Sequence, residues 1–219
     1  PGHLQADHAL DHGVGYTMNP YRDHWDGHCG LEVVTGTGDL VRTGMGALPG
    51  SKTWQHFKYG FGPHVDGLFS QSNFGVVTKM GVWLMPEPEC YMPLQLRVWR
   101  EDDLGPLVDT LRQLMLDRTI ENVPQIWNTI AHASVISSRA PWYDGDDPIP
   151  DDVIDRMARE LNTGRWFMRF ALYGDEDVVD LKYRKLKAAF ERIPDAEVTG
   201  AKYTTADMPT LEHPFDRVQ

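Results

Sequence analysis

The segment Pro86-Glu87-Pro88 divides the chain into two parts whose residue patterns differ. Proline lacks the backbone N–H that a sheet needs, so the apolar segment 75–85 before it is expected to end there as a strand. The part before the prolines contains most of the glycines and seven of the nine histidines, whereas strand and helix patterns alternate after them. We therefore predict a domain boundary after residue 86, with domains at 1–86 and 87–219.

Short strands joined by tight turns are predicted for the first part. Residues 31–34 and 40–42 are apolar segments on either side of the glycine-containing turn 36–39, a pattern typical of a β-hairpin. The apolar segment 75–85 is rich in β-branched residues and predicts a further strand. This part is therefore expected to be built mainly from strands and loops.

Strands that alternate with one-sided helices are predicted for the second part. Leu94, Leu96 and Val98 alternate with polar residues, which is the period of a half-buried strand. The later segments predict, in order, a helix with the stripe Leu104, Val108, Leu111 and Met115, a helix from Pro150 to Gly164, a strand at 166–173, a helix with the stripe Val179, Tyr183, Leu186, Phe190 and Ile193, and a strand at 197–203. This order predicts an α+β fold with an antiparallel sheet covered on one side by helices.

Net charge, hydropathy and cysteine content indicate which partners and which cellular compartment to expect. The formal charge of -11, from 32 acidic and 21 basic side chains, argues against nucleic acid. No stretch is apolar enough to span a membrane, so no membrane partner is expected. Cys29 and Cys90 lack the spacing of a zinc or redox motif and are too few for a disulfide framework. A reducing compartment is expected, namely the cytoplasm, with the periplasm as the alternative.

Four histidines raise the question of a metal site. His8 and His12 stand four residues apart, and His24 and His28 repeat this spacing beside acidic residues. Such a spacing places two ligands on one face of a helix. The nearby glycines and Pro20 argue against a helix through His24, and no zinc motif accompanies the pairs. We expect histidines that serve as caps or hydrogen-bond donors in a polar loop region, and no metal site.

Two segments with glycines are suited to bringing bare backbone close to a flat ligand. Residues 13–17 read Gly-Val-Gly-Tyr-Thr, with two glycines in alternation. Residues 73–79 place Gly75 at the entrance of an apolar strand, where main-chain N–H and C=O groups could pair with an adenine edge. A plain turn and an ordinary strand start are the alternatives. Spacing alone leaves both open, because the complete dinucleotide fingerprint is absent.

Six segments between residues 13 and 81 form a distinctive series when they are read together. They are Gly13-Val14-Gly15-Tyr16-Thr17, Cys29-Gly30-Leu31-Glu32-Val33-Val34, Arg42-Thr43-Gly44-Met45-Gly46-Ala47-Leu48-Pro49-Gly50, Tyr59-Gly60-Phe61-Gly62-Pro63, Asp66-Gly67-Leu68-Phe69 and Gln71-Ser72-Asn73-Phe74-Gly75-Val76-Val77-Thr78-Lys79-Met80-Gly81. In this order they resemble the family of vanillyl-alcohol oxidase, 4-cresol dehydrogenase and eugenol oxidase. Weaker similarity continues at 122–124, 164–166 and 171–174.

The resemblance implies a two-domain flavoprotein with FAD as its cofactor. Residues 1–86 would form the second half of a PCMH-type FAD-binding domain, and residues 87–219 the beginning of an α+β cap domain with an antiparallel sheet. Val14 and Tyr16 map to the wall of the substrate cavity. The strand at 75–77 maps to the backbone that meets the adenine part of FAD. The cofactor-binding residues implied in this way are Gly13, Val14, Gly15, Tyr16, Gly75, Val76 and Val77.

The resemblance also implies a reaction. Family members transfer a hydride from the para-benzylic carbon of a phenol to flavin N5, which leaves a quinone methide that water attacks. The family's phenolate-binding Tyr and Arg, its acidic residue near N5 and the His or Tyr that links FAD covalently are expected outside residues 1–219. The chain alone is therefore expected to be an inactive fragment with unknown catalytic residues. The implied partners are a small phenolic substrate, an electron-acceptor protein such as a cytochrome, or O₂, and further copies of the chain in a homo-oligomer.

Two other hypotheses stay open at this point. The chain could be a truncated module that binds a nucleotide or a partner without redox chemistry. It could also come from an FAD oxidoreductase of a non-phenolic substrate such as a sugar, lactate or an alkyl group. The remainder of the parent chain discriminates between them, because an upstream nucleotide-binding half and a downstream His or Tyr attachment site favour the enzyme.

We predict that Tyr16→Phe in the intact enzyme alters turnover, or the choice among para-alkyl phenols, with little change in stability. The reason is that only a hydroxyl group facing the substrate is lost. The measurements are Tm and kcat/KM for vanillyl alcohol, 4-cresol and eugenol. A hydrogen-bonded core tyrosine would instead lower stability by about 1 kcal/mol and leave the substrate ratios unchanged. That result would remove Tyr16 from the site.

Overall fold

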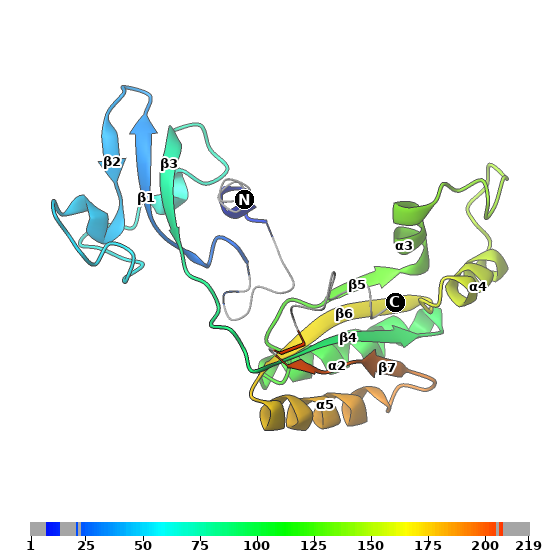
Figure 1. Cartoon of the computed structure of the whole chain (residues 1–219). Coiled ribbons are helices and arrows are strands. Elements are labelled where there is room, and N and C mark those ends of the chain that lie inside the picture. The colour runs from blue at the N-terminus through cyan, green and yellow to red at the C-terminus, as the bar shows by residue number, and fades with distance from the viewer. Residues whose placement is uncertain (1–7, 14–20, 22, 205, 208–219) are drawn as a thin grey trace. The chain divides into compact units, whose positions relative to one another are not determined.

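The structure is a computed structural model that describes residues 8–13, 21, 23–204 and 206–207. The chain divides into two units between Pro86 and Glu87, called unit 1 (Pro1–Pro86) and unit 2 (Glu87–Gln219). Figure 1 shows the elements of each unit. The division falls at the proline-containing segment, where the chain cannot continue a strand. The assignment of the units to an FAD-binding and a cap domain stays a prediction.

Unit 1 contains a three-stranded antiparallel sheet in the order β2-β1-β3. Its strands are β1 (His28–Thr35), β2 (Leu40–Arg42) and β3 (Gly75–Val82). The hairpin of β1 and β2 is confirmed, with Glu32 opposite Arg42 and Val34 opposite Leu40. Two 3-10 helices, η1 (Gly44–Ala47) and η2 (Asp66–Leu68), lie in the long connection from β2 to β3. The central strand β1 is buried over its first six residues, whereas β2 is exposed throughout.

The strand predicted at 75–85 is shorter in the structure. β3 ends at Val82, although the apolar run continues to Met85. The last pair of the ladder joins Val82 to His28, the first residue of β1. Because a strand extends only as far as its partner does, apolar character beyond Val82 does not prolong it.

Unit 2 is built on a five-stranded antiparallel sheet. The path is β5-β6-β4-β7, and β8 also pairs with β4. The strands are β4 (Cys90–Val98), β5 (Gln125–Asn128), β6 (Trp166–Gly174), β7 (Glu197–Gly200) and β8 (Tyr203–Thr204). All nine residues of β4 pair with β6 in one continuous register, from Cys90 opposite Gly174 to Val98 opposite Trp166.

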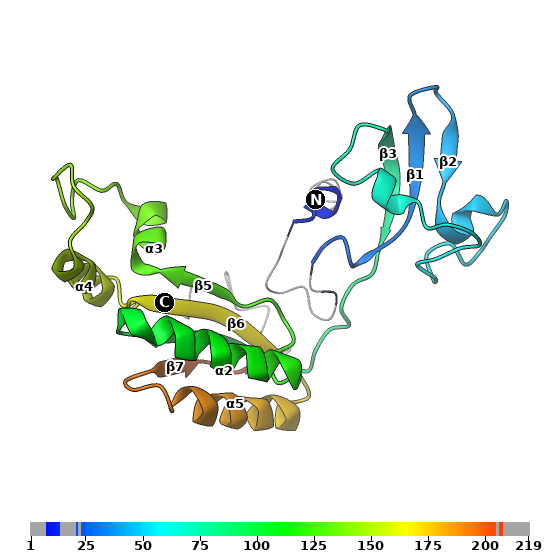
Figure 2. The same ribbon diagram turned by 180° about the vertical axis from the view of Figure 1, so that it is seen from behind.

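Helices cover one face of this sheet. Figures 1 and 2 show unit 2 from opposite sides, and in both views α2 and α5 run along the same face. The helices of unit 2 are α2 (Leu104–Leu116), preceded by the 3-10 turn η3 (Glu101–Asp103), α3 (Thr129–Ile136), α4 (Asp151–Glu160) and α5 (Glu176–Phe190). The predicted α+β fold with an antiparallel sheet is thus confirmed. None of the helices in the described part of the chain is long and apolar enough to cross a bilayer.

The core of unit 2 lies between the sheet and helices α2 and α5. Strands β4 and β6 contribute alternate side chains, as a period of two requires, and α5 contributes Val179, Leu186 and Phe190. Phe170 and Phe190 are among the largest side chains that are fully buried. Buried aliphatic and aromatic area of this kind is the main source of stability for a layered α+β unit.

The predicted face of α2 is correct at Leu111 and wrong at Val108 and Met115. Its buried residues are Leu107, Leu111 and Leu114, whereas Val108 and Met115 are 43% and 38% exposed. Both sets fit a helical period, so the sequence pattern did not distinguish them. Contact with the sheet and with α5 selects the three leucines.

Two elements of unit 2 were not predicted. β5 is a strand of only four half-buried residues, and α3 has eight residues that are mostly apolar. Elements this short carry little periodicity. The predicted strand at 197–203 is interrupted, because β7 ends at Gly200 and β8 begins at Tyr203.

The corrected face of α2 gives a prediction. Leu107→Ala is expected to lower the free energy of unfolding by about 2–5 kcal/mol, because it leaves a cavity in the core. Val108→Ala, the matched control at the adjacent position, is expected to change it by no more than about 0.5 kcal/mol. Urea denaturation of the two variants measures both values. A larger loss of unfolding free energy for Val108→Ala than for Leu107→Ala would support the face predicted from the sequence.

Candidate functional site

The outer edge of β3 is the first candidate site. Among the described residues β3 pairs only with β1, so the backbone groups on its other edge have no strand partner. Gly75, Val76 and Val77 begin this strand, opposite Thr35, Val34 and Val33. Val76 is 68% exposed. Unpaired N–H and C=O groups on a strand edge are suited to pairing with a flat, polar heterocycle.

Gly75 is required for the close approach of β3 to β1. A Cβ atom at this position would lie 2.5 Å from Val33 Cγ1 and 2.9 Å from Val34 O. Both distances are too short for any larger residue without a shift of the strands. The glycine thus fixes where β3 starts, and with it the position of the backbone at residues 75–77.

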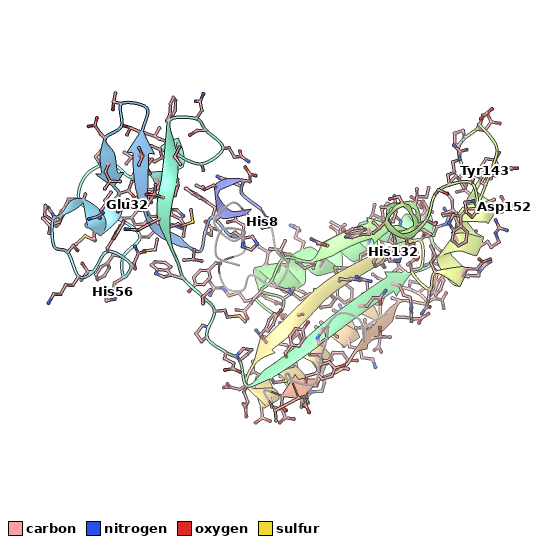
Figure 3. All side chains as sticks on the ribbon, turned by 45° about the horizontal axis from the view of Figure 1, so that its top comes forward. His8, Glu32, His56, His132, Tyr143 and Asp152 are labelled. Atoms are coloured by element: carbon pink, nitrogen blue, oxygen red, sulfur yellow. The ribbon has the colours of Figure 1, made fainter. Side chains whose placement is uncertain are left out.

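Glu32 ties the three strands of unit 1 together. Its side chain is almost completely buried in β1 and accepts hydrogen bonds from Arg42 Nε at 2.8 Å and Thr78 Oγ1 at 3.0 Å. Lys79 Nζ forms an ion pair with the same carboxylate, 3.3 Å from Glu32 Oε1. The hydrogen bond from Arg42 holds the pKa of the Glu32 carboxyl below its usual range. Figure 3 labels Glu32 on the sheet.

The glycine-rich segment at 13–17 is described only at Gly13. The Gly13 N–H donates to His8 O at 2.7 Å, and the Gly13 carbonyl accepts from the His24 N–H at 3.2 Å. Both backbone groups are therefore used within unit 1, and Gly13 would serve a ligand only through its lack of a side chain. Val14, Gly15 and Tyr16 lie outside the described residues.

The histidines do not form the pairs that their spacing suggested. His8 and His24 stack at 5.6 Å between ring centroids, and His12 stacks on Trp25 at 5.3 Å. His28 instead meets side chains from the connection between β2 and β3. His28, His64 and Asp66 bring one ligand atom each to within 4.8 Å of one another. No spacing rule links residues so far apart in sequence, so sequence reasoning missed His64 and Asp66.

The centre of this cluster is buried. His28 and Asp66 are fully buried, and His28 Nε2 lies 3.0 Å from Asp66 Oδ2. His64 Nδ1 lies 3.6 Å from Asp66 Oδ1. Burial raises the pKa of Asp66, but the polar groups of His28 and Thr43 and the charge of His64 outweigh it and hold that pKa below its usual value. Asp66 therefore stays an ionised carboxylate near neutral pH.

The face of the unit 2 sheet opposite α2 and α5 carries a second group of aromatic side chains. Phe167 is fully buried there, and the His132 ring lies edge-on to it at 5.0 Å. Arg169 lies over the same phenyl ring at 5.8 Å. Burial, followed by the charge of Arg169, lowers the pKa of His132. A neutral His132 is therefore expected at neutral pH, in a role as packing partner or hydrogen-bond donor.

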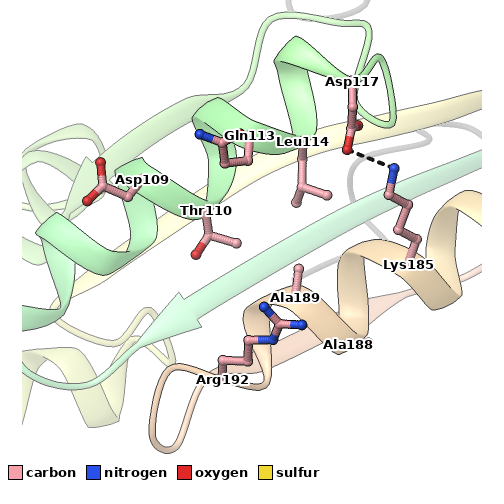
Figure 4. A pocket seen from close by; sticks show the side chains of 9 residues that line it. All are labelled: Asp109, Thr110, Gln113, Leu114, Asp117, Lys185, Ala188, Ala189 and Arg192. Atoms are coloured by element: carbon pink, nitrogen blue, oxygen red, sulfur yellow. Dashed lines mark hydrogen bonds and ion pairs between the residues drawn. The ribbon is translucent and has the colours of Figure 1, made fainter.

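The described residues of unit 2 line at least two pockets. One, of about 520 Å³, lies between α2 and α5, and Figure 4 shows the ion pair of Asp117 and Lys185 at one end of it. The other, of about 620 Å³, lies between α3 and α4 and includes Trp142 and Met157 in its wall. Its Arg139 already donates to the carbonyls of Gly145 and Asp147. Among the described residues, neither pocket is lined by a cluster that could bind a metal ion.

Comparison with known proteins identifies relatives over most of the chain. No protein-family model matches it. The 4-cresol dehydrogenase [hydroxylating] flavoprotein subunit of Pseudomonas putida is 42% identical over 186 residues, which are 84% of this chain and 35% of that relative. The chain thus spans about a third of the length of this curated relative.

Solved structures agree with this relationship. A structure of p-cresol methylhydroxylase with substrate bound matches 98% of the chain with a TM-score of 0.82 and 38% identity, and the match is 41% of that protein. A structure of 4-ethylphenol oxidase from Gulosibacter chungangensis in complex with isoeugenol matches 98% with a TM-score of 0.84 and 33% identity, covering 40% of that protein. These matches confirm the predicted fold class. Over most of its length the chain is therefore similar to members of the family of vanillyl-alcohol oxidase and 4-cresol dehydrogenase.

Proposed function

We propose that this chain is part of an FAD-dependent oxidoreductase that acts on para-substituted phenols. The observation that carries the proposal is the 42% identity to a 4-cresol dehydrogenase flavoprotein subunit along 84% of the chain. The reaction is hydride transfer from the para-benzylic carbon of the phenol, and the resulting quinone methide is attacked by water. Because the chain spans about a third of that relative, activity belongs to the intact protein.

The residues of unit 1 are suited to holding FAD, which would accept the hydride when bound. The unpaired edge of β3 presents main-chain donors and acceptors, and Gly75 lets this strand lie close against β1. Backbone groups on a fixed strand lose no side-chain entropy when a ligand binds. In this proposal the backbone at 75–77 contacts the adenine part, while Val14 and Tyr16 face the flavin and the substrate.

The two units have different roles in the proposal. Unit 1 forms the later part of the FAD-binding domain, and unit 2 the first part of the cap domain. The strands and helices of unit 2 supply a rigid layer with a packed core. A rigid layer is what a domain needs to exclude water from a hydride-transfer site.

The partners of the intact protein follow from its relatives. One relative is named as a flavoprotein subunit, which supports an electron-acceptor protein such as a cytochrome as partner. A homo-oligomeric assembly stays a prediction. Another is an oxidase, which supports O₂ as the alternative acceptor. Oxygen consumption during turnover, compared with reduction of a cytochrome under nitrogen, separates the two. Cys29 and Cys90 are unpaired and buried, in keeping with a reducing compartment.

The first test is the flavin itself. We predict that the purified intact protein shows flavin absorbance and that 4-cresol bleaches it in the absence of an acceptor. The chain 1–219 alone is expected to bind FAD weakly or not at all, because a partial site has to order the same ligand with fewer contacts. An intact, folded protein that stays colourless with FAD supplied would refute the cofactor assignment. Bleaching by a sugar or lactate, but not by 4-cresol, would favour the non-phenolic alternative.

The second test concerns the main-chain contact at β3. Val77→Pro is expected to weaken FAD binding of the intact protein by about tenfold or more, since proline removes the N–H and disrupts the strand. Val77→Ala keeps the backbone and is expected to change the affinity by less than about threefold. Fluorescence titration with FAD measures both, and circular dichroism controls for folding. Equal affinity in two folded variants would show that this strand does not contact FAD.

A further inference from the structure

The cluster of His28, His64 and Asp66 is not used by the proposed flavin chemistry. Its atoms come from the start of β1 and from the segment that leads into η2. His28 and Asp66 are fully buried, and the His64 side chain is 31% exposed. The cluster therefore has a closed inner side and one side that reaches solvent.

The hydrogen bonding of His28 defines which ring nitrogen carries a proton. Its Nδ1 atom lies 2.5 Å from Trp25 O, and a carbonyl oxygen only accepts, so Nδ1 is the donor. Its Nε2 atom faces the Asp66 carboxylate at 3.0 Å. A proton donated by Nε2, or a cation placed between the two groups, accounts for this contact.

Asp66 provides an independent sign of a missing partner. Its Oδ1 atom is buried and no donor lies within normal hydrogen-bond distance of it, although the Thr43 hydroxyl helps to keep the pKa of this carboxyl low. The nearest ring nitrogen, His64 Nδ1, is 3.6 Å away, which is beyond hydrogen-bond range. A proton shared between His28 and Oδ2 would leave Oδ1 unsatisfied, whereas a cation between all three groups would satisfy both oxygens.

We propose that His28, His64 and Asp66 bind a zinc ion that links β1 to the segment before η2. Zinc binds histidine nitrogen and carboxylate oxygen at about 2.0–2.2 Å, so neighbouring ligands in a tetrahedral site lie roughly 3.3 Å apart. His28 Nε2 lies 3.0 Å from Asp66 Oδ2 and His64 Nδ1 lies 3.6 Å from Asp66 Oδ1, and one ligand atom from each of the three residues lies within 4.8 Å of the others. Water takes the fourth position, on the exposed side beside His64.

The surroundings of His28 are those of a metal ligand held in place. Ligating histidines generally donate their other N–H to a carbonyl or a carboxylate, as His28 does to Trp25. The Trp25 ring stacks on His28 with centroids 3.8 Å apart, which fixes the plane of the imidazole. The ion would hold together two segments of unit 1 that are far apart in sequence, and so stabilise it.

The test uses the intact protein after treatment with a chelator and then titration with Zn²⁺ alone. The variant is His64→Ala, which is expected to fold because this ring is partly exposed. The matched control is His56→Ala, which removes an exposed histidine of the same connection outside the cluster (Figure 3). Bound zinc is measured by mass spectrometry after gel filtration, and Tm is measured with and without Zn²⁺.

The expected result is about one zinc per chain and a higher Tm in the wild-type protein and in His56→Ala. His64→Ala should bind zinc about tenfold more weakly or worse, with little rise in Tm. Asp66→Asn, if folded, should lose the zinc response as well. Equal zinc retention by the wild-type protein and His64→Ala, or no retention by the wild-type protein, would overturn the proposal. Neither outcome bears on flavin binding, so the two proposals fail independently.

Discussion

The pairing of β4 with β6 is the interaction on which unit 2 depends. These strands share nine consecutive residue pairs, and the other edge of β4 pairs with β7 and β8. The side chains that β4 and β6 turn to one face form the core with α2 and α5. Because the ladder and the core share the same two strands, backbone hydrogen bonds and buried apolar area stabilise each other. β5 and the two outer helices, α3 and α4, are attached to this centre through β6 and its flanking turns.

Unit 1 is held together by polar contacts to a greater extent. The buried carboxylate of Glu32 bridges all three strands, and the His28 and Asp66 pair joins the start of β1 to η2. Buried ionic groups of this kind cost desolvation energy, and they specify one arrangement when all of their partners are present. The sheet of unit 1 has few strands and leaves β3 at an edge. Such a sheet fits a segment whose relatives extend well beyond it in length.

In the proposed function, unit 1 contacts the ligand mainly through its backbone, and unit 2 provides a rigid packed layer. In this proposal the backbone of β3 faces the ligand, and the side chains of Glu32 and Val33 behind it set where that backbone lies. Binding through backbone atoms tolerates much change of side chains while the path of the chain is kept. Unit 2 contributes shape and rigidity. The groups that would hold the phenolate belong to other parts of the intact protein in this proposal.

Local patterns in the sequence predicted strands β4 and β6 and helices α2, α4 and α5 of unit 2, the hairpin of unit 1, the break at Pro86-Glu87-Pro88 and the resemblance to the family. Each of these depends on residues close in the chain, such as the alternation along β4 or the glycines of a turn. The tertiary structure alone decided the buried face of α2, the existence of β5 and the meeting of His28 with His64 and Asp66. A helical period allows several faces, and a four-residue strand needs its partner. The start of a strand and a later loop meet only when the sheet and its turns bring them together.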